Sequence, residues 1–166
     1  GSIIGVEGFQ VLVEVDITQG LPTFDIVGLP DSAVKESRER VRTAIKNSGF
    51  DFPIKRITVN LAPANTKKEG PSFDFPIAVG ILVGLNIITE EDIENSFIAG
   101  ELSLDGSLRP VNGILPMVIQ AKQNNIHKIF IPFENSQEAA LIDGIEVYGI
   151  KNLNHFISHF KNAPII

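Results

Sequence analysis

The sequence predicts one α+β domain in which a mixed sheet packs against helices. Three observations lead to this prediction. Apolar and polar residues alternate from Val11 to Thr18, with the period of a strand. Asp105-Gly106 separates two apolar runs, which is typical of a tight hairpin. Asp31 and Gly49 bracket a helical pattern, so we expect a helix that Asp31 caps and Gly49 ends.

The first half of the chain alternates strands and helices. After a break at Gly20-Leu21-Pro22, residues 24–27 are expected to form a return strand. The helix over 32–48 has its apolar positions on one face, and residues 57–61 form another strand. A polar loop over 62–70 then leads into a buried helix over 73–85. Within that helix, Gly80 and Gly84 are spaced to let a neighbouring strand or helix approach closely.

The second half begins with a short acidic turn capped by Thr89. Strands over 97–104 and 108–111 flank the predicted hairpin, and a helix follows over 114–124. Further strands are expected at 128–131 and 147–150, with Ser136 and Asn152 capping two short helices.

Composition limits the class of protein. The chain has 166 residues, is 43% hydrophobic and has a mean hydropathy of +0.16, which suits one folded domain. It has no cysteine, which excludes disulfides and thiolate metal sites and suits the cytoplasm. The apolar stretch 73–88 contains Asp74, Pro76 and Asn86 and is shorter than the roughly 20 residues of a membrane span, so we expect no membrane contact. Gly1-Ser2 without an initial Met resembles a cloning remnant, so a fragment of a longer chain is expected.

Charge is unevenly distributed. The net charge is −6, but residues 35–68 carry +6 and the remainder carries −12. Such a window can face an anion, or it can be a solvated helix face with local ion pairs such as Glu36 with Arg40. The candidate contacts to nucleic acid or to another subunit are Arg38, Arg42, Lys46, Lys55, Arg56, Lys67 and Lys68. Of these, Arg38, Arg42 and Lys46 recur every four residues and should form one exposed stripe.

Ser72 stands on a Gly-Pro turn before the apolar helix. It could be a nucleophile beside backbone N–H groups that hold an oxyanion, or simply the N-cap of that helix. A serine needs a base, and no histidine is near it in sequence. His155 and His159 share a helix face but lack a third ligand, so no metal site is predicted. The chain also lacks the glycine-rich phosphate loop of ATPases.

Several motifs resemble the N-terminal domain of the ComM/YifB family of Mg-chelatase-like AAA+ ATPases. They are Phe24-Asp25-Ile26-Val27-Gly28-Leu29-Pro30-Asp31, Ala33-Val34-Lys35-Glu36-Ser37, Arg56-Ile57-Thr58-Val59-Asn60-Leu61-Ala62-Pro63-Ala64 and Phe73-Asp74-Phe75-Pro76-Ile77-Ala78. The resemblance covers nearly the whole chain. It implies that an ATPase domain, with its ATP and Mg, follows this domain and is absent from these 166 residues.

The chain also resembles the proteolytic domain of Lon and the C-terminal domain of RadA-type proteins, which implies a ribosomal protein S5 domain 2-like fold. Glu69-Gly70-Pro71-Ser72 is similar to the turn that carries the Lon nucleophile. Gly100-Glu101-Leu102-Ser103-Leu104-Asp105-Gly106 and Pro110-Val111-Asn112-Gly113 are similar to the segments that lead to its lysine base. Leu115 and Met117 occupy the positions of that base, and neither can take a proton.

These observations favour a non-catalytic module that assembles a homo-oligomeric ring and engages DNA or a protein partner, in DNA remodelling or competence. The fragment itself would then need no cofactor. The alternative is a serine peptidase in which Ser72 uses a non-standard lysine, such as Lys67, Lys68 or Lys122.

Overall fold

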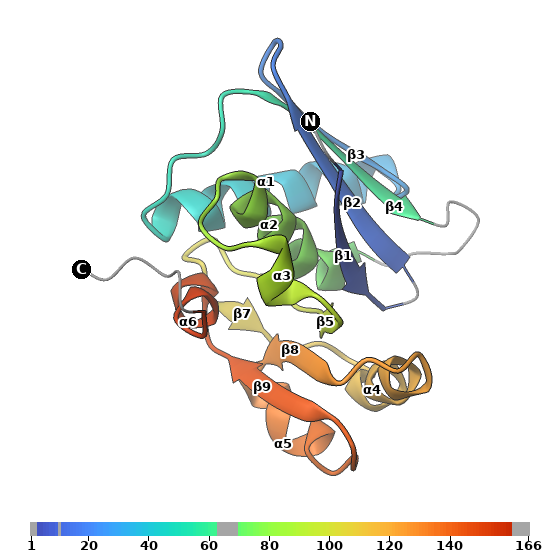
Figure 1. The fold of residues 1–166 in the computed structure, drawn as a ribbon. Coiled ribbons are helices and arrows are strands. Elements are labelled where there is room, and N and C mark those ends of the chain that lie inside the picture. Colours follow the sequence, from blue (N-terminus) through green and yellow to red (C-terminus); the bar gives the residue numbers. More distant parts are fainter. Residues whose placement is uncertain (1–2, 10, 63–69, 161–166) are drawn as a thin grey trace.

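The computed structural model describes residues 3–9, 11–62 and 70–160. Its main feature is a seven-stranded mixed sheet in the order β3-β4-β2-β1-β5-β8-β9 (Figure 1). The mixed α/β class predicted from the sequence is therefore confirmed, whereas the S5 domain 2-like assignment stays a prediction. A separate two-stranded sheet joins β6 (Glu101–Leu102) to β7 (Leu108–Arg109) around Asp105-Gly106, as the hairpin signal predicted.

The first half of the sheet consists of β1 (Ile4–Gly8), β2 (Val11–Thr18), β3 (Thr23–Val27) and β4 (Arg56–Ala62). β2 is antiparallel to both β1 and β4. The return strand was expected next to β2, but β3 lies at the sheet edge and pairs in parallel with β4. The reason is that α1 (Asp31–Asn47) connects β3 to β4 as a crossover, which places the two strands in the same direction.

The second half contains β5 (Ser96–Ile98), β8 (Lys128–Pro132) and β9 (Glu146–Ile150), all parallel. The strand expected over 97–104 is divided into β5 and β6. β1 and β5 are joined by only the pair Glu7 and Phe97, so the halves meet at a narrow seam. In Figure 1 the two groups of strands diverge from this seam.

Helices cover one face of the first half. α1 and α2 (Asp74–Gly84) pack against the inward side chains of β1, β2 and β3. A Cβ at Gly80 would collide with Val15, and one at Gly84 with Ile17, so these glycines do admit a neighbouring strand. A second apolar cluster forms around α4 (Ile114–Gln123) beside β5 and β8. Short helices complete the fold, namely α3 (Glu90–Ile93), α5 (Ser136–Ala139) and α6 (Leu153–Ile157).

The predicted caps are only partly correct. Thr89 forms a capping box with Asp92, and the Asn152 side chain accepts from the His155 N–H. Pro30 rather than Asp31 is the N-cap of α1, and the Ser136 hydroxyl donates backwards to the Phe133 carbonyl instead of capping α5. No helix in the described ranges is long and apolar enough to cross a membrane.

Candidate functional site

The turn that carries Ser72 is hydrogen-bonded to the segment that follows β5. A short 3-10 helix, Gly70–Phe73, leads into α2. The Gly100 N–H donates to the Ser72 carbonyl at 3.0 Å, and the Phe75 N–H donates to the Gly100 carbonyl at 3.0 Å. Phe73 is the N-cap of α2 and makes no side-chain cap. The expectation that Ser72 caps this helix is therefore wrong, because the 3-10 turn moves the helix start beyond it.

The positions expected for a lysine base lie on α4 and belong to the core. Met117 is 7% exposed and packs in the second apolar cluster, against which Leu115 is also packed. On the same helix, the Lys122 side chain lies against Gly144. Its Nζ is 3.6 Å from the position that a Cβ atom on Gly144 would occupy. Lys67 and Lys68 are outside the described residues. The two α4 positions thus contribute packing and no proton acceptor.

Asp74, two residues after Ser72, is fully buried and bonded on both oxygens. Ser37 Oγ donates to Oδ1 at 2.7 Å, and the Leu102 N–H donates to Oδ2 at 3.1 Å. Arg40 donates to both carboxylate oxygens, from Nε to Oδ2 at 2.6 Å and from Nη2 to Oδ1 at 3.1 Å. Asp74 at the start of α2 is therefore bonded to both α1 and β6.

Burial and hydrogen bonding in this network shift the pKa values of Asp74 and Arg40. Burial raises the pKa of the Asp74 carboxyl, and the hydrogen bonds from Arg40 and Ser37 oppose that rise. The hydrogen bonds between Arg40 and Asp74 raise the pKa of the Arg40 guanidinium, and burial opposes that rise. Arg40 therefore belongs to a structural link between α1, α2 and β6, although the sequence placed it in the basic window.

The predicted basic stripe on α1 does not lie open to solvent. Arg38 is half-buried and donates from Nη1 to the Phe24 carbonyl at 3.1 Å. Arg42 is also half-buried, with its guanidinium 5.9 Å from the Phe24 ring centroid and 5.6 Å from that of Phe52. Only Lys46 of the three is exposed. Arg42 lies over these rings because they offer a flat, electron-rich surface, whereas Arg38 is held by the backbone carbonyl.

Three cations instead converge on a small groove beside β3. We call it the basic groove, and its volume is about 220 Å³. It is lined by Arg42, Lys46, Lys55, Pro22, Thr23, Phe24, Phe52, Pro53 and Ile54. Arg56 lies apart, with its aliphatic stem beside Gly20 in the turn between β2 and β3. Of the five candidate contacts that lie in the described ranges, three come together in one site.

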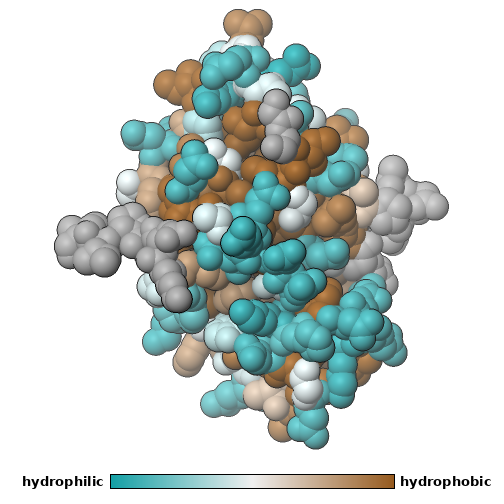
Figure 2. Space-filling model, viewed as in Figure 1, coloured by the Kyte–Doolittle hydropathy of each residue, from teal (hydrophilic) through white to brown (hydrophobic). Residues whose placement is uncertain are grey.

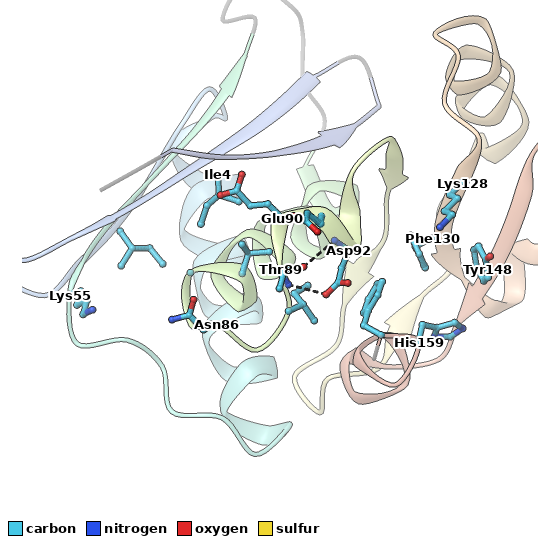
Figure 3. A pocket seen from close by; sticks show the side chains of 16 residues that line it. Ile4, Lys55, Asn86, Thr89, Glu90, Asp92, Lys128, Phe130, Tyr148 and His159 are labelled. Atoms are coloured by element: carbon cyan, nitrogen blue, oxygen red, sulfur yellow. Dashed lines mark hydrogen bonds between the residues drawn. The ribbon is translucent and has the colours of Figure 1, made fainter. Parts of the chain in front are cut away.

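A larger groove, which the sequence did not indicate, opens between the two halves (Figure 3). Its volume is about 880 Å³, and its lining includes Lys55, Lys128 and the carboxylates of α3. Phe130 stacks on Tyr148 at 5.0 Å, and His159 meets the edge of Tyr148 at 5.6 Å. Asp92 is held by the capping box with Thr89, drawn as dashed lines. Within the described ranges, no three His, Cys, Asp or Glu residues are grouped to hold a metal.

The histidines have local structural roles. His155 Nδ1 accepts the Lys151 N–H at 3.0 Å, and its ring centroid lies 5.0 Å from that of His159. Burial lowers the pKa of His155, with smaller lowering effects from His159 and Lys151. α6 ends at Ile157, so His159 lies beyond the regular helix. The pair is thus part of the packing at the end of α6.

Comparison with known proteins identifies the class. Residues 13–135 match the family described as subunit ChlI of Mg-chelatase, and the chain belongs to this family. It is 43% identical to the uncharacterized protein YifB of Escherichia coli over 86% of its length, and 40% identical to the competence protein ComM of Haemophilus influenzae over 90%. The resemblance to the N-terminal part of the Mg-chelatase-like ComM and YifB proteins is thereby confirmed.

A weaker similarity links the chain to a protease. It is 34% identical to Lon protease 2 of Bacillus subtilis over 80% of its length. The chain spans only 28% of YifB, 29% of ComM and 24% of this Lon protease. What those whole proteins do is therefore not established for these 166 residues.

Proposed function

We propose that this chain is a non-catalytic module of a Mg-chelatase-like AAA+ ATPase, which helps to assemble the ring and to engage DNA or a protein partner. One observation carries the non-catalytic part of the proposal. Leu115 and Met117 stand where the resemblance to Lon implies a lysine base, and both pack into the apolar cluster around α4. Without a base, the Ser72 hydroxyl is a weak nucleophile.

The ATPase activity of the longer protein would belong to a different domain. ATP and Mg would bind to an ATPase domain that follows this one, since the sequence has no phosphate loop. The name of the competence protein ComM supports a role in the handling of DNA by cells that take it up. Contacts to DNA phosphates or to a neighbouring subunit would come from the described cations Arg38, Arg42, Lys46, Lys55 and Arg56.

Removal of the module from the longer protein tests this function. Two forms are compared, the longer protein and the same protein without residues 1–160. We expect the shortened form to assemble less completely on ATP, measured by sedimentation velocity, and to hold DNA less tightly, measured by fluorescence anisotropy. Equal assembly and equal DNA affinity of the two forms would contradict the proposal.

A peptidase assay separates the proposal from its enzymatic alternative. The 166-residue chain and its Ser72→Ala variant are incubated with a fluorescent casein substrate, with Lon as the positive control. We expect no turnover above buffer from either chain. Turnover that Ser72→Ala abolishes would establish the peptidase instead, and single Lys67→Ala, Lys68→Ala and Lys122→Ala variants would then locate its base.

A further inference from the structure

We propose that the basic groove of one copy of this chain binds an acidic groove on a second copy, in a head-to-tail contact. The acidic groove is defined below by its lining residues. The role of this contact in a ring rests on the proposed function, whereas the contact itself can be tested on the 166-residue chain alone.

The basic groove has the chemistry of a site for carboxylates next to apolar groups. The part of its lining that the structure describes contains three cations and no acidic residue. Arg42 is fixed over Phe24 and Phe52, so its guanidinium loses little freedom on binding an anion. Its nearest carboxylate oxygen, on Glu39, is 3.9 Å away, which makes only a weak exposed pair. Ile54 on the groove wall is 82% exposed, which provides an uncovered apolar contact.

The acidic groove has the opposite charge. Its volume is about 710 Å³, and four carboxylates line it together with apolar and amide side chains. The lining comprises Glu7, Glu90, Glu91, Glu94, Gly5, Leu12, Ile93, Asn95, Asn124 and Ile126. Among the residues that the structure describes, its lining includes no lysine or arginine. Burial in this groove raises the pKa of the Glu7 carboxyl.

The two grooves are built from different elements and share no described residue. Along β1 the buried positions Ile4 and Val6 face the helices, whereas Gly5 and Glu7 point the other way and line the acidic groove. The basic groove is built from α1, on the helix-covered face, and from the edge strand β3. Strands β4 and β2 lie between β3 and β1.

This placement decides the kind of contact. Lys55, Glu90 and Glu91 also line the large groove between the halves. Arg42 and Lys46 of the basic groove, and Glu7 and Glu94 of the acidic groove, are not among the described residues of that large groove, so they remain for contacts between copies stacked in one direction. Such a heterologous contact closes into a ring when the rotation between copies allows it. DNA is the competing occupant of the basic groove. DNA binding would not involve the acidic groove, so changes in the acidic groove distinguish DNA binding from a contact between copies.

Site-specific cross-linking tests the contact directly, because the chain has no cysteine. Ile54→Cys marks the basic groove, and Asn124→Cys marks the acidic groove. Leu141→Cys, at a site 77% exposed and in neither groove, is the matched control. The Ile54→Cys and Asn124→Cys chains are mixed at low salt with a short bis-maleimide. We expect about tenfold more cross-linked dimer than when either is mixed with Leu141→Cys.

A yield equal to the control would overturn the contact. So would an Ile54→Cys homodimer as abundant as the mixed dimer, since that would indicate a symmetric arrangement. The cross-link should also fall about tenfold when the salt is raised to roughly 0.5 M, because exposed charges are then screened. A cross-link insensitive to salt would contradict the electrostatic basis.

Charge reversal provides a second, independent test. One variant carries Lys46→Glu with Lys55→Glu, and the other carries Glu91→Lys with Glu94→Lys. All four residues are exposed, so both variants should fold, as circular dichroism would verify. With the cysteine marks in place, each variant alone should lose the cross-link, while the two mixed together should regain it.

Three further outcomes distinguish DNA binding, the contact between copies and the proposed function. If only the lysine variant changes behaviour, by losing DNA affinity with a salt dependence flatter by about 0.9 per phosphate contact, then DNA is the occupant and the proposal is wrong. If the cross-link forms but removal of residues 1–160 leaves the longer protein's assembly unchanged, the contact stands and the proposed function fails. If the deletion impairs assembly but no cross-link forms, the function stands and this contact is wrong.

Discussion

At the scale of single residues, the Asp74 carboxylate has the largest structural effect. It is 0% exposed and joins α1, α2 and β6 through Ser37, Arg40 and the Leu102 N–H. Removing one partner of a buried ion pair leaves the other without compensation, which is strongly destabilising. This link also fixes the start of α2, next to the turn that carries Ser72.

We therefore expect Asp74→Ala to lower the free energy of unfolding by about 3–5 kcal/mol. Urea denaturation followed by circular dichroism measures the change. Asp25→Ala, at an exposed position of β3, is the matched control and should change stability little. A loss below about 1 kcal/mol for Asp74→Ala, within the range of an ordinary hydrogen bond, would contradict the role of the buried network.

His155 makes stability depend on pH. Its Nδ1 accepts the Lys151 N–H, which only the neutral ring can do, and burial lowers its pKa below the usual value near 6.5. As the pH falls through about 6.5, the unfolded chain takes up the proton first, so the folded state loses stability until the folded pKa is passed. Above this window the contribution is complete.

His155→Gln should accordingly flatten the plot of unfolding free energy against pH between about 7.5 and 5, where a histidine changes charge. Urea titrations at several pH values measure it. His127→Gln removes a histidine outside α6 and is the control. The prediction fails if the slope of the His155→Gln chain equals that of the parent chain.

At the scale of elements, the approach of α2 to β2 depends on two glycines. A Cβ at Gly80 would meet Val15, whose branched side chain has little freedom to move. A Cβ at Gly84 would meet Ile17 in the same way. The spacing of four residues places both glycines on one side of the helix, along the strand that they contact.

Gly80→Ala should cost about 1–3 kcal/mol through overpacking, although alanine favours the helix by about 1 kcal/mol. Thermal or urea unfolding measures the cost. A double-mutant cycle with Val15→Ala gives the control, because removal of the two methyl groups should cancel most of the penalty of Gly80→Ala. If the two changes are additive, the steric explanation is wrong.

Basic residues of α1 have different surroundings on different sides of the helix. Arg40 is directed to Asp74, Arg38 to the Phe24 carbonyl, and Arg42 to the Phe24 and Phe52 rings. Lys46 alone of the predicted stripe is exposed. The helix therefore uses some of its positive charge in packing and presents the rest at the basic groove.

At the scale of the whole molecule, charge gathers in two grooves that are built from different elements. The basic groove is lined by residues of α1 and β3, and the acidic groove by residues of β1 and α3. Figure 2 shows one side of the molecule, where hydrophilic residues are abundant and apolar ones gather mainly in the upper part. The uneven charge of the sequence, +6 in residues 35–68 and −12 elsewhere, is thus partly resolved into opposed grooves.

For the whole chain we expect no ATP hydrolysis, because it has no phosphate loop. Release of inorganic phosphate from ATP with Mg²⁺ is measured for the 166 residues and, as a positive control, for the longer protein. Only the longer protein should release phosphate. Release by the 166-residue chain that persists after repeated purification would contradict this expectation.

Local sequence determined much of the fold. Alternation in Val11–Thr18, the caps at Thr89 and Asn152 and the Asp105-Gly106 turn each depend on a few neighbouring residues, so each could be predicted. The Gly80 and Gly84 spacing predicted close packing for the same reason. β1 was missed because Ile4–Gly8 contains two glycines and is short.

Tertiary structure alone decided the partners. The crossover through α1 makes β3 parallel to β4, and the packing of α1 on α2 brings Arg40 to Asp74, 34 residues away. The same holds for Lys55 beside Arg42, and for Glu7 beside Glu90, Glu91 and Glu94. These groupings depend on how distant segments cross in space, and that is not encoded in the spacing of residues along any one segment. The sequence by itself determined most of the elements and the family, whereas the arrangement of charge into two grooves exists only in the folded chain.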